Sequence, residues 1–330
     1  MNRSKIQVGV VGAACGLPLA KQFSSDLARA ESISEDGVSG LGIEEVPVCR
    51  GETASALALA AAKEALQRAA IDPLQVDVIV DYSILPQEYL VPAWNMGNKL
   101  QHELGATKAF TVGFSGGASA NVLMALSSAT AMLQTDGKLK TALLVAGDVA
   151  IPGNRILQTK SPLTVLGDSG GAMVLRRDAE RVIVVDAEIK TRGENHDVYY
   201  IPAGALANDD PEQYRITVDA ARYDAALASN HLQDAVKALL ARNGLSIQEI
   251  SCAILPNLSR AHHARLQEML GLAPAQVCAC KLRDHGHLQG TDLVVNYLAM
   301  TDKNALKPGD YVLVASDGMG TMSGAVLLRY

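Results

Sequence analysis

The chain has 330 residues, of which 48% are hydrophobic and 19% are charged, and its formal net charge is −6. This hydrophobic content is enough for a large buried core, either as one domain or as two similar halves. The sequence has no basic run and no cluster of aromatic and basic residues, which argues against a nucleic-acid partner.

The N-terminal stretch IQVGVVGAACG reads as a strand that enters a glycine turn. It is short and interrupted by glycines, so we predict neither a signal peptide nor a membrane span. It also lacks the G-x-G-x-x-G pattern of dinucleotide-binding proteins. The cysteines are few, odd in number and mostly set in apolar runs, which indicates a reducing compartment, and we expect a cytoplasmic protein.

Residues 52–83 form the first long amphipathic segment. ETASALALAAAKEAL has the apolar spacing of a helix, Asp72-Pro73 marks a turn, and VDVIVDYS has the apolar run of a buried strand. A strand that is apolar on both faces is typical of sheets covered by helices, as in α/β proteins.

Residues 111–126, TVGFSGGASANVLMAL, contain two candidate nucleophiles. Ser115 lies in G-F-S-G-G, which fits the elbow of serine hydrolases, and His285 or His287 could complete the order Ser, acid, His. Ser119 opens the helix that follows, where unpaired N–H groups and the helix dipole stabilise negative charge. On residue chemistry alone, helix capping is the simpler role for Ser119.

A third serine, Ser169, lies in GDSGG within residues 166–178. That string surrounds the nucleophile of trypsin-like proteases, which need a histidine and then an aspartate earlier in the chain. Only His102 precedes Ser169, in a segment with a helical pattern. We therefore predict a structural role for Ser169 in a turn between two strands.

The second part of the chain repeats the first. Residues 226–257, ALASNHLQDAVKALLARNGLSIQEISCAILPN, align with residues 52–83 without a gap, so that Lys63 falls on Lys237. Both segments read as a helix, a turn and a buried strand. Chance similarity between helix–strand units would not preserve an ungapped match of this length.

The ends of the two halves also correspond. Residues 310–330, DYVLVASDGMGTMSGAVLLRY, are similar to KTALLVAGDV at 140–149 followed by LGDSGGAMVLRRD at 166–178. Each reads as a buried strand, a glycine turn and a returning strand. We predict a duplicated α/β protein with halves at residues 1–178 and 179–330, in which helices are layered around mixed sheets.

The order of these motifs resembles ketoacyl-ACP synthase III of the thiolase superfamily over nearly the whole chain. ETASALALAAAKEAL is similar to that family's first long helix, and TVGFSGGASANVLMALSSA to its nucleophile loop. LLVAGDV with LGDSGGAMVL is similar to its strand and G-D-G-x-G-A turn, and ASDGMGTMSGAVLLRY to its closing glycine-rich loop. The resemblance implies a thiolase-like fold, with two duplicated βα halves in a layered α-β-α-β-α core.

Three positions depart from the family pattern. Ser119 stands where the family usually has cysteine, Asn257 where it has histidine, and His287 where it has asparagine. Some divergent members carry Gly-His-x-x-x-x-Asp at the last position or use serine, and His287, Asp292 and Ser119 resemble them. Those members move acyl groups onto carrier proteins, alcohols or amines, or prime a polyketide chain.

The resemblance brings Ser119 and His287 to a shared pocket. A serine hydroxyl is a weak nucleophile at neutral pH, so it needs a general base within about 3 Å. We assign that role to His287, with Asp292 orienting the other ring nitrogen, as in a Ser-His-Asp triad. Backbone N–H groups at Ser119 and in the loop Gly318-Met319-Gly320 would meet the developing oxyanion.

Other residues keep alternative roles. His196, in GENHDVYY, is the alternative base. Asn257 is either a turn residue or a group that binds the substrate carbonyl. His262 and His263 are expected on a solvated helix face. Cys278 and Cys280 have the spacing of half a metal site but no suitable partners, so we interpret them as buried thiols.

We therefore expect an acyltransferase that moves an acyl group through a Ser119 ester to a small-molecule acceptor, in polyketide-type or antibiotic biosynthesis. The alternative is a decarboxylative priming ketosynthase that forms a C–C bond with malonyl-ACP, since the family's histidine and asparagine are present but exchanged. Two other classes stay open: an inactive thiolase-fold partner subunit, and a serine hydrolase that uses Ser115.

The resemblance also implies a homodimer, and a donor thioester carried on coenzyme A or on the phosphopantetheine arm of an acyl carrier protein. The sequence has no P-loop and no metal-ligand spacing. We accordingly expect no metal and no tightly bound cofactor.

Overall fold

The computed structural model describes residues 6–85, 88, 94–151, 153–158, 161–202, 213, 215–229, 231–277, 281–302 and 306–330. Within them, nine strands form one mixed sheet in the order β13-β14-β15-β10-β1-β9-β6-β4-β5. In chain order these strands are β1 (Val8–Gly16), β4 (Val78–Asp81), β5 (Phe110–Gly113), β6 (Thr141–Asp148), β9 (Ser169–Arg177), β10 (Ile183–Thr191), β13 (Ile250–Ile254), β14 (Tyr311–Ser316) and β15 (Met322–Arg329).

The order of the strands repeats the same pattern from each end of the sheet. β4 runs parallel to β6, β6 is antiparallel to β9, and β9 is antiparallel to β1. The same relations hold for β13, β14, β15 and β10 in turn. The two half-sheets join where Gly9 of β1 pairs with Ile183 of β10. The duplication expected from the sequence is therefore present in the topology.

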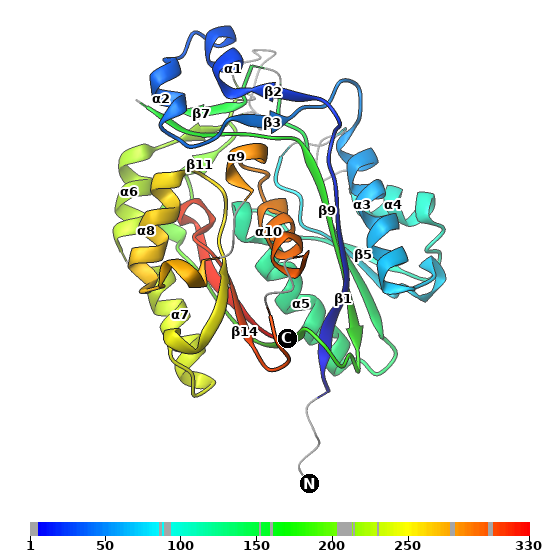
Figure 1. Ribbon diagram of the computed structural model, residues 1–330. Coiled ribbons are helices and arrows are strands. Elements are labelled where there is room, and N and C mark those ends of the chain that lie inside the picture. Colours follow the sequence, from blue (N-terminus) through cyan, green and yellow to red (C-terminus); the bar gives the residue numbers. More distant parts are fainter. Residues whose placement is uncertain are drawn as a thin grey trace.

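Helices separate and cover the two half-sheets (Figure 1). α3 packs on β1, β9 and β6, α7 packs on β15 and β10, and α5 contacts strands of both halves. The helices are α1 (Ser24–Ala30), α2 (Glu35–Ser39), α3 (Ala54–Ala69), α4 (Met96–Leu104), α5 (Asn121–Thr135), α6 (Ala220–Ala228), α7 (His231–Arg242), α8 (Arg260–Leu270), α9 (Leu282–His285) and α10 (Thr291–Asp302).

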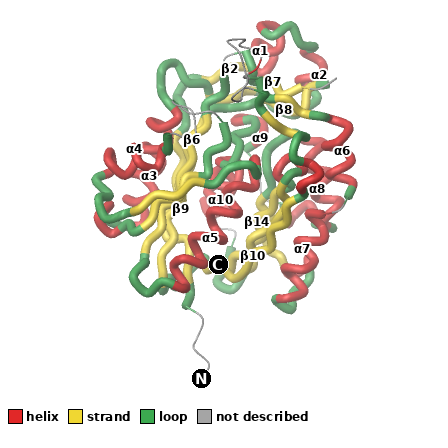
Figure 2. The backbone as a smooth tube through the Cα atoms, turned by 180° about the vertical axis from the view of Figure 1, so that it is seen from behind, coloured by secondary structure: helices red, strands yellow, loops and turns green. Residues whose placement is uncertain are grey.

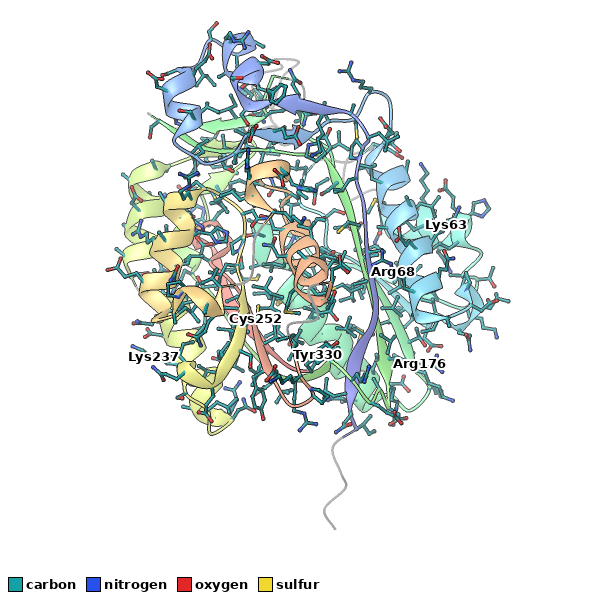
Figure 3. The ribbon with its side chains drawn as sticks, viewed as in Figure 1. Lys63, Arg68, Arg176, Lys237, Cys252 and Tyr330 are labelled. Atoms are coloured by element: carbon teal, nitrogen blue, oxygen red, sulfur yellow. The ribbon has the colours of Figure 1, made fainter. Side chains whose placement is uncertain are left out.

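The layers follow the expected α-β-α-β-α order. α3 and α4 lie on one outer side, α7 and α8 on the other, and α5 and α10 between the half-sheets (Figures 1 and 2). Lys63 of α3 and Lys237 of α7, the matched positions of the repeat, accordingly appear on opposite outer sides (Figure 3). Each outer helix buries one apolar face against its half-sheet and leaves its charged face in water.

The glycines of the N-terminal strand serve packing. A Cβ atom at Gly12 would lie 2.4 Å from the carbonyl oxygen of Ala65, and one at Gly16 would lie 2.3 Å from that of Leu57. Both carbonyls belong to α3. β1 can approach the helix backbone this closely only because these positions have no side chain.

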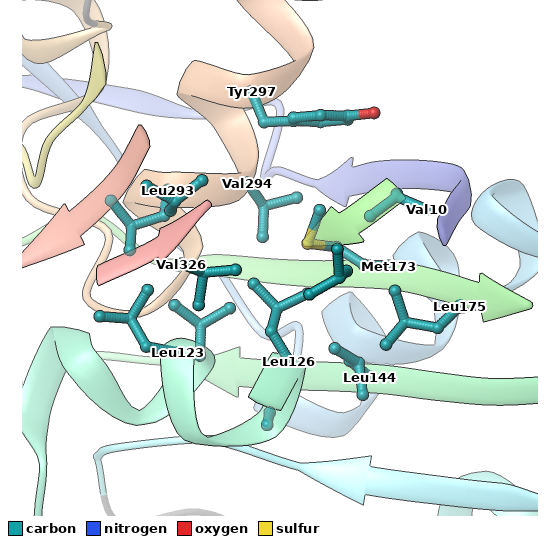
Figure 4. Close-up of a cluster of buried hydrophobic side chains, with 14 of the residues drawn as sticks. Val10, Leu123, Leu126, Leu144, Met173, Leu175, Leu293, Val294, Tyr297 and Val326 are labelled. Atoms are coloured by element: carbon teal, nitrogen blue, oxygen red, sulfur yellow. The ribbon is translucent and has the colours of Figure 1, made fainter. Parts of the chain in front are cut away.

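The central core is shared by both halves. α5 and α10 contribute buried apolar side chains that meet those of β6, β9 and β15 (Figure 4). The labelled members include Leu123, Leu126, Leu144, Met173, Leu175, Leu293, Val294 and Val326. Because these residues come from both repeats, neither half buries its inner face alone.

Three two-stranded sheets complete the described part of the chain. They pair β2 (Lys21–Phe23) with β3 (Glu45–Pro47), β7 (Ile156–Gln158) with β8 (Pro162–Val165), and β11 (Tyr199–Tyr200) with β12 (Thr217–Val218). No helix among the described residues has the length and apolar character needed to cross a bilayer.

Candidate active site

Ser119 lies in a short 3-10 turn, η2 (Ala118–Ala120), that leads from β5 into α5. Its side chain is buried and does not cap α5, because its Oγ lies 2.9 Å from Oγ of Ser316 at the end of β14. Ala118, just before it, has a φ of +44°, a conformation that non-glycine residues adopt at a cost. A strained turn thus aims the hydroxyl at the second half of the molecule.

Ser119 also contributes a backbone N–H group. The N–H groups of Ser119 and Met319 are buried and have no hydrogen-bond acceptor among the described residues. Met319 is the middle residue of η7 (Gly318–Gly320), where it has a φ of +55°. Buried N–H groups without an acceptor are rare in folded proteins, and two at one site can bind a carbonyl oxygen or an oxyanion.

The loop η7 packs directly on the serine turn. A Cβ atom at Gly318 would lie 2.7 Å from the carbonyl oxygen of Gly117 and 3.0 Å from Cβ of Ala120. The Gly318 N–H donates to Oγ of Ser316 at 3.2 Å, and the Gly320 N–H donates to the Asp317 carbonyl at 2.9 Å. Of the three residues expected to bind an oxyanion in this loop, Met319 is thus the one whose N–H has no acceptor in the described part of the chain.

His287 and Asp292 form a buried pair. Nδ1 of His287 lies 2.5 Å from Oδ2 of Asp292, and neither residue is more than 1% exposed. The carboxylate also accepts the N–H groups of Leu288 and Asn257, each at 2.7 Å. Fixing Nδ1 in this way leaves Nε2 as the nitrogen that can take up or release a proton. α10 begins at Thr291, so His287 lies in the loop before this helix.

The segments next to Ser119 and His287 pack against each other. η2 packs against α10, whose first turn contains Asp292. In the described part of the chain, the Ser119 hydroxyl has Ser316 as its partner and makes no hydrogen bond to His287. Hydrogen bonds of catalytic groups often form only when substrate is bound, so this geometry is compatible with a serine–histidine pair.

Asn257 is held within the second half. Its side-chain amide exchanges hydrogen bonds with Asn296, at 2.9 and 3.3 Å, and its Oδ1 lies 3.3 Å from Nε2 of His263. Through these contacts, Asn257 anchors the end of the strand next to Asp292.

Two family models match the chain. The model of 3-oxoacyl-[acyl-carrier-protein] synthase III matches residues 115–193, and that of the synthase III C-terminal region matches residues 240–330. The first match begins at the serine loop, and the second spans the histidine loop and η7. The chain belongs to the ketoacyl-ACP synthase III-like proteins of the thiolase superfamily.

Individual relatives span the whole synthase III-like chain. A β-ketoacyl-ACP synthase III of Erythrobacter litoralis is 26% identical, covering 98% of this chain and 100% of the relative. The solved priming β-ketosynthase of a polyketide biosynthetic pathway is 21% identical, with a TM-score of 0.84 and coverage of 98% and 96%. The solved acyltransferase ChlB3 is 20% identical, with a TM-score of 0.83 and coverage of 98% and 97%. The structural matches confirm the thiolase-like fold.

The other candidate serines and the alternative base have different surroundings. Ser115 is exposed, between β5 and η2. Ser169 is buried at the start of β9, where its Oγ lies 3.4 Å from the carbonyl oxygen of Leu288 and supports the histidine loop. The side chain of His196 is 76% exposed, next to Asp197.

The expectation of a solvated position for His262 and His263 is wrong. His262 is 6% exposed, with Nε2 3.4 Å from Oδ2 of Asp317, which also accepts the Tyr223 hydroxyl at 2.8 Å. Burial raises the pKa of Asp317, but the attraction and hydrogen bond of His262 and the bond of Tyr223 outweigh it, so the pKa is lowered overall. His263 is half-buried, and burial lowers its pKa to about 4. Helix α8 turns this face inward to anchor η7.

No cluster of three metal-ligating side chains occurs among the described residues. Cys278 and Cys280, interpreted above as buried thiols, lie outside the described residues.

Two residues of the site region were not singled out from the sequence. Ser316 ends β14, and Asp148 ends β6, its counterpart in the first half. Burial raises the pKa of Asp148 to about 7, although its bonds from the N–H groups of Leu85 and Ile84 oppose this. The alignment of AGD at 146–148 with ASD at 315–317 carried part of this signal, because it pairs Asp148 with Asp317 and places Ser316 opposite Gly147.

Proposed function

We propose that this chain is an acyltransferase that forms an ester between an acyl group and Ser119, and then passes that group to a small-molecule acceptor. The observation that carries the proposal is a buried serine turn that packs against the helix whose Asp292 holds His287. Two N–H groups at this turn and at η7 have no acceptor among the described residues. This combination contains a nucleophile, a base with its orienting carboxylate, and an oxyanion site.

In the first step, Nε2 of His287 takes the proton of the Ser119 hydroxyl as Oγ attacks the thioester carbonyl carbon. The negative charge on the carbonyl oxygen is bound by the N–H groups of Ser119 and Met319, and one such donor is worth about 3 kcal/mol in other acyl-transfer enzymes. The carbon–sulfur bond then breaks, and the leaving thiolate receives the proton from His287. The Ser119 hydroxyl turns from Ser316 to His287 for this step.

In the second step, an acceptor hydroxyl or amine gives its proton to Nε2 of His287 and attacks the ester carbon. The ester carbon–oxygen bond breaks, and the proton returns to Oγ of Ser119. Asp292 keeps the imidazole in one tautomer throughout and stabilises the imidazolium that forms twice. The same two N–H groups bind the oxyanion of both steps, so no rearrangement of the site separates them.

The contacts of Asn257 favour acyl transfer over decarboxylative condensation. Its amide is engaged with Asn296 and His263, so it is less available to hold an enolate oxygen beside His287. A priming ketosynthase would release CO₂ from malonyl-ACP, and this release distinguishes the alternative.

We also propose a donor, a pathway and an assembly for this chain. Relatives named as ACP-dependent synthases support a thioester on coenzyme A or acyl carrier protein as donor. The names of the priming β-ketosynthase and the acyltransferase motivate a polyketide-type pathway. For assembly, we propose a homodimer.

The test is intact-protein mass spectrometry after incubation with a panel of acyl-CoAs, followed by peptide mapping. We expect an acyl adduct on Ser119 that is lost in Ser119→Ala. His287→Ala should abolish acylation, and Asp292→Asn should slow it by about 10²–10⁴-fold because the tautomer is no longer fixed.

The matched control is Ser115→Ala, which removes the exposed serine of the same loop and should leave acylation unchanged. An adduct that maps to Ser115 would indicate a serine hydrolase instead. Absence of any adduct with both acyl-CoA and acyl-ACP donors would support the inactive partner subunit instead.

A further inference from the structure

A group of buried polar atoms without partners lies next to the histidine loop. Each belongs to a residue that is at most 1% exposed, and none has a hydrogen-bond partner that meets normal geometry among the described residues. They are the hydroxyl of Tyr82, the hydroxyl of Thr291, Oδ2 of Asp148 and Nε2 of Gln289. We call these four residues the polar subsite.

The four residues form one cluster rather than scattered exceptions. A Cβ atom at Gly171 would lie 2.9 Å from Oγ1 of Thr291 and 3.0 Å from the hydroxyl of Tyr82. Asp148 lies beside the same segment, since its Oδ1 accepts the N–H groups of Ile84 and Leu85, which follow Tyr82 closely in the chain. Gln289 and Thr291 flank the turn between His287 and α10, so the cluster borders the candidate base.

The cluster also borders the serine turn. The side-chain amide of Asn121, the first residue of α5, donates to the carbonyl oxygen of Tyr82 at 3.4 Å. The end of β4 is therefore held against the turn that contains Ser119. Tyr82 of the polar subsite thus lies beside the start of α5, next to the turn that contains Ser119.

Leaving such atoms unpaired is costly. A buried donor or acceptor without a partner costs about 1–3 kcal/mol. The surrounding core is otherwise apolar, and the Tyr82 ring is itself packed in it. A folded protein keeps unpaired polar groups together at one place chiefly where another molecule completes their hydrogen bonds.

We propose that the polar subsite binds a hydroxyl group on the acyl chain that is transferred to Ser119. This deepens the proposed function and rests on it. A hydroxyl can donate to Oδ2 of Asp148 while it accepts from Nε2 of Gln289, which a saturated hydrocarbon chain cannot do. The substrate class is therefore a hydroxyacyl thioester.

Because the polar subsite is buried, we assign it to binding of the acyl group and not of the pantetheine arm of the donor. The pantetheine arm of the donor must lead out to solvent, whereas the far end of an acyl chain can terminate in the interior.

The experiment compares donors that differ by one oxygen. Single-turnover acylation of Ser119 is measured by mass spectrometry with butyryl-CoA, 2-hydroxybutyryl-CoA and 3-hydroxybutyryl-CoA. We expect at least one hydroxyacyl donor to react about tenfold faster than butyryl-CoA, because a site built to bond a hydroxyl rejects the analogue that lacks it. Tyr82→Phe and Asp148→Asn should each remove most of this advantage.

The control variant is Tyr297→Phe, which removes a tyrosine hydroxyl from a cleft shared with Val10 and Tyr330. It should keep the full preference for the hydroxyacyl donor. Equal rates for all three donors, or a preference that survives in Tyr82→Phe and Asp148→Asn, would overturn the proposal and leave ordered water as the occupant of the subsite.

A second measurement separates this proposal from the proposed function. Calorimetric titration of Ser119→Ala with the same three thioesters reports binding without chemistry. Tighter binding of a hydroxyacyl-CoA, lost in the double variant with Tyr82→Phe, supports the subsite even if wild-type Ser119 is never acylated. Equal affinities would overturn it, whatever the outcome of the acylation test.

Discussion

At the scale of single residues, the exchange of histidine and asparagine explains how a serine can take the place of a cysteine. Asn257 anchors a strand end through Asn296, and its N–H group helps to hold the carboxylate of Asp292. That carboxylate in turn holds His287 at 2.5 Å. A cysteine needs little help to ionise, whereas a serine needs a well-oriented base, and under the proposed function His287 is that base.

The raised pKa of Asp148 leads to a prediction about stability that does not depend on catalysis. Burial raises its pKa from 3.8 to about 7, so the folded protein keeps a proton that the unfolded chain releases at lower pH. The stabilising effect of this proton is complete below about pH 4 and is lost as the pH rises through about 7. The Asp148→Asn variant has no carboxyl group to ionise at this position. Its free energy of unfolding should therefore not show this loss as the pH rises.

The measurement is the free energy of unfolding by urea from pH 4 to pH 8. Between these limits the wild type should lose about 4 kcal/mol relative to Asp148→Asn. Comparing the two proteins cancels the contributions of the other carboxyl groups. Parallel pH profiles would show that the carboxyl is not held in its neutral form.

At the scale of elements, two short turns, η2 and η7, create the site, and each comes from a different repeat. Both contain residues with positive φ, at Ala118 and Met319, and they touch at Gly117 and Gly318. His262 and Tyr223 fix η7 from behind through Asp317. The strain is thus maintained by packing on both sides, as is common where backbone N–H groups must be held in place.

Gly318→Ala tests the contact between the turns. The added Cβ would meet the Gly117 carbonyl at 2.7 Å and would force a side chain into a φ of +49°. We expect a loss of about 2–4 kcal/mol in the free energy of unfolding and a loss of acylation of about 10²-fold, because the Met319 N–H shifts.

Gly244→Ala is the matched control for Gly318→Ala. Gly244 has a φ of +67°, and a Cβ there would meet nothing within 4 Å, so it isolates the cost of the backbone conformation. That cost is about 1 kcal/mol, and acylation should be unaffected. Equal effects of the two substitutions would show that the contact between the turns is unimportant.

At the scale of the whole molecule, one edge of the sheet remains open. β5 pairs only with β4 among the described strands, and Phe110 on it is 48% exposed. The N–H groups of Phe110 and Phe114 point to β4, so those of Thr111 and Gly113 point outward. Such an edge can pair with a second copy, and we expect the proposed homodimer to form there.

Light scattering after size-exclusion chromatography tests this edge. The wild type should elute as a dimer, and Gly113→Pro should shift it to a monomer because proline removes an outward N–H group. Gly113→Ala keeps the N–H group, and the atom nearest to its added Cβ would be 3.7 Å away. This variant should therefore remain dimeric. A monomeric wild type, or a dimeric Gly113→Pro, would place the interface elsewhere.

The sequence by itself determined the fold class and indicated the duplication. Helical and strand periodicity depends on local spacing, and an ungapped repeat makes two halves readable without coordinates. The serine, histidine and aspartate were singled out by the resemblance to ketoacyl-ACP synthase III, and their catalytic roles stay a prediction.

Only the tertiary structure decided how these residues are supported. The contact of Ser119 with Ser316 spans nearly two hundred positions. The inward turn of His262, the unpaired N–H group of Met319 and the polar subsite likewise depend on elements that meet across the two halves. A pattern along the chain reports which face of an element is apolar. Which polar atoms find partners depends on the packing of distant segments, and local sequence does not encode it.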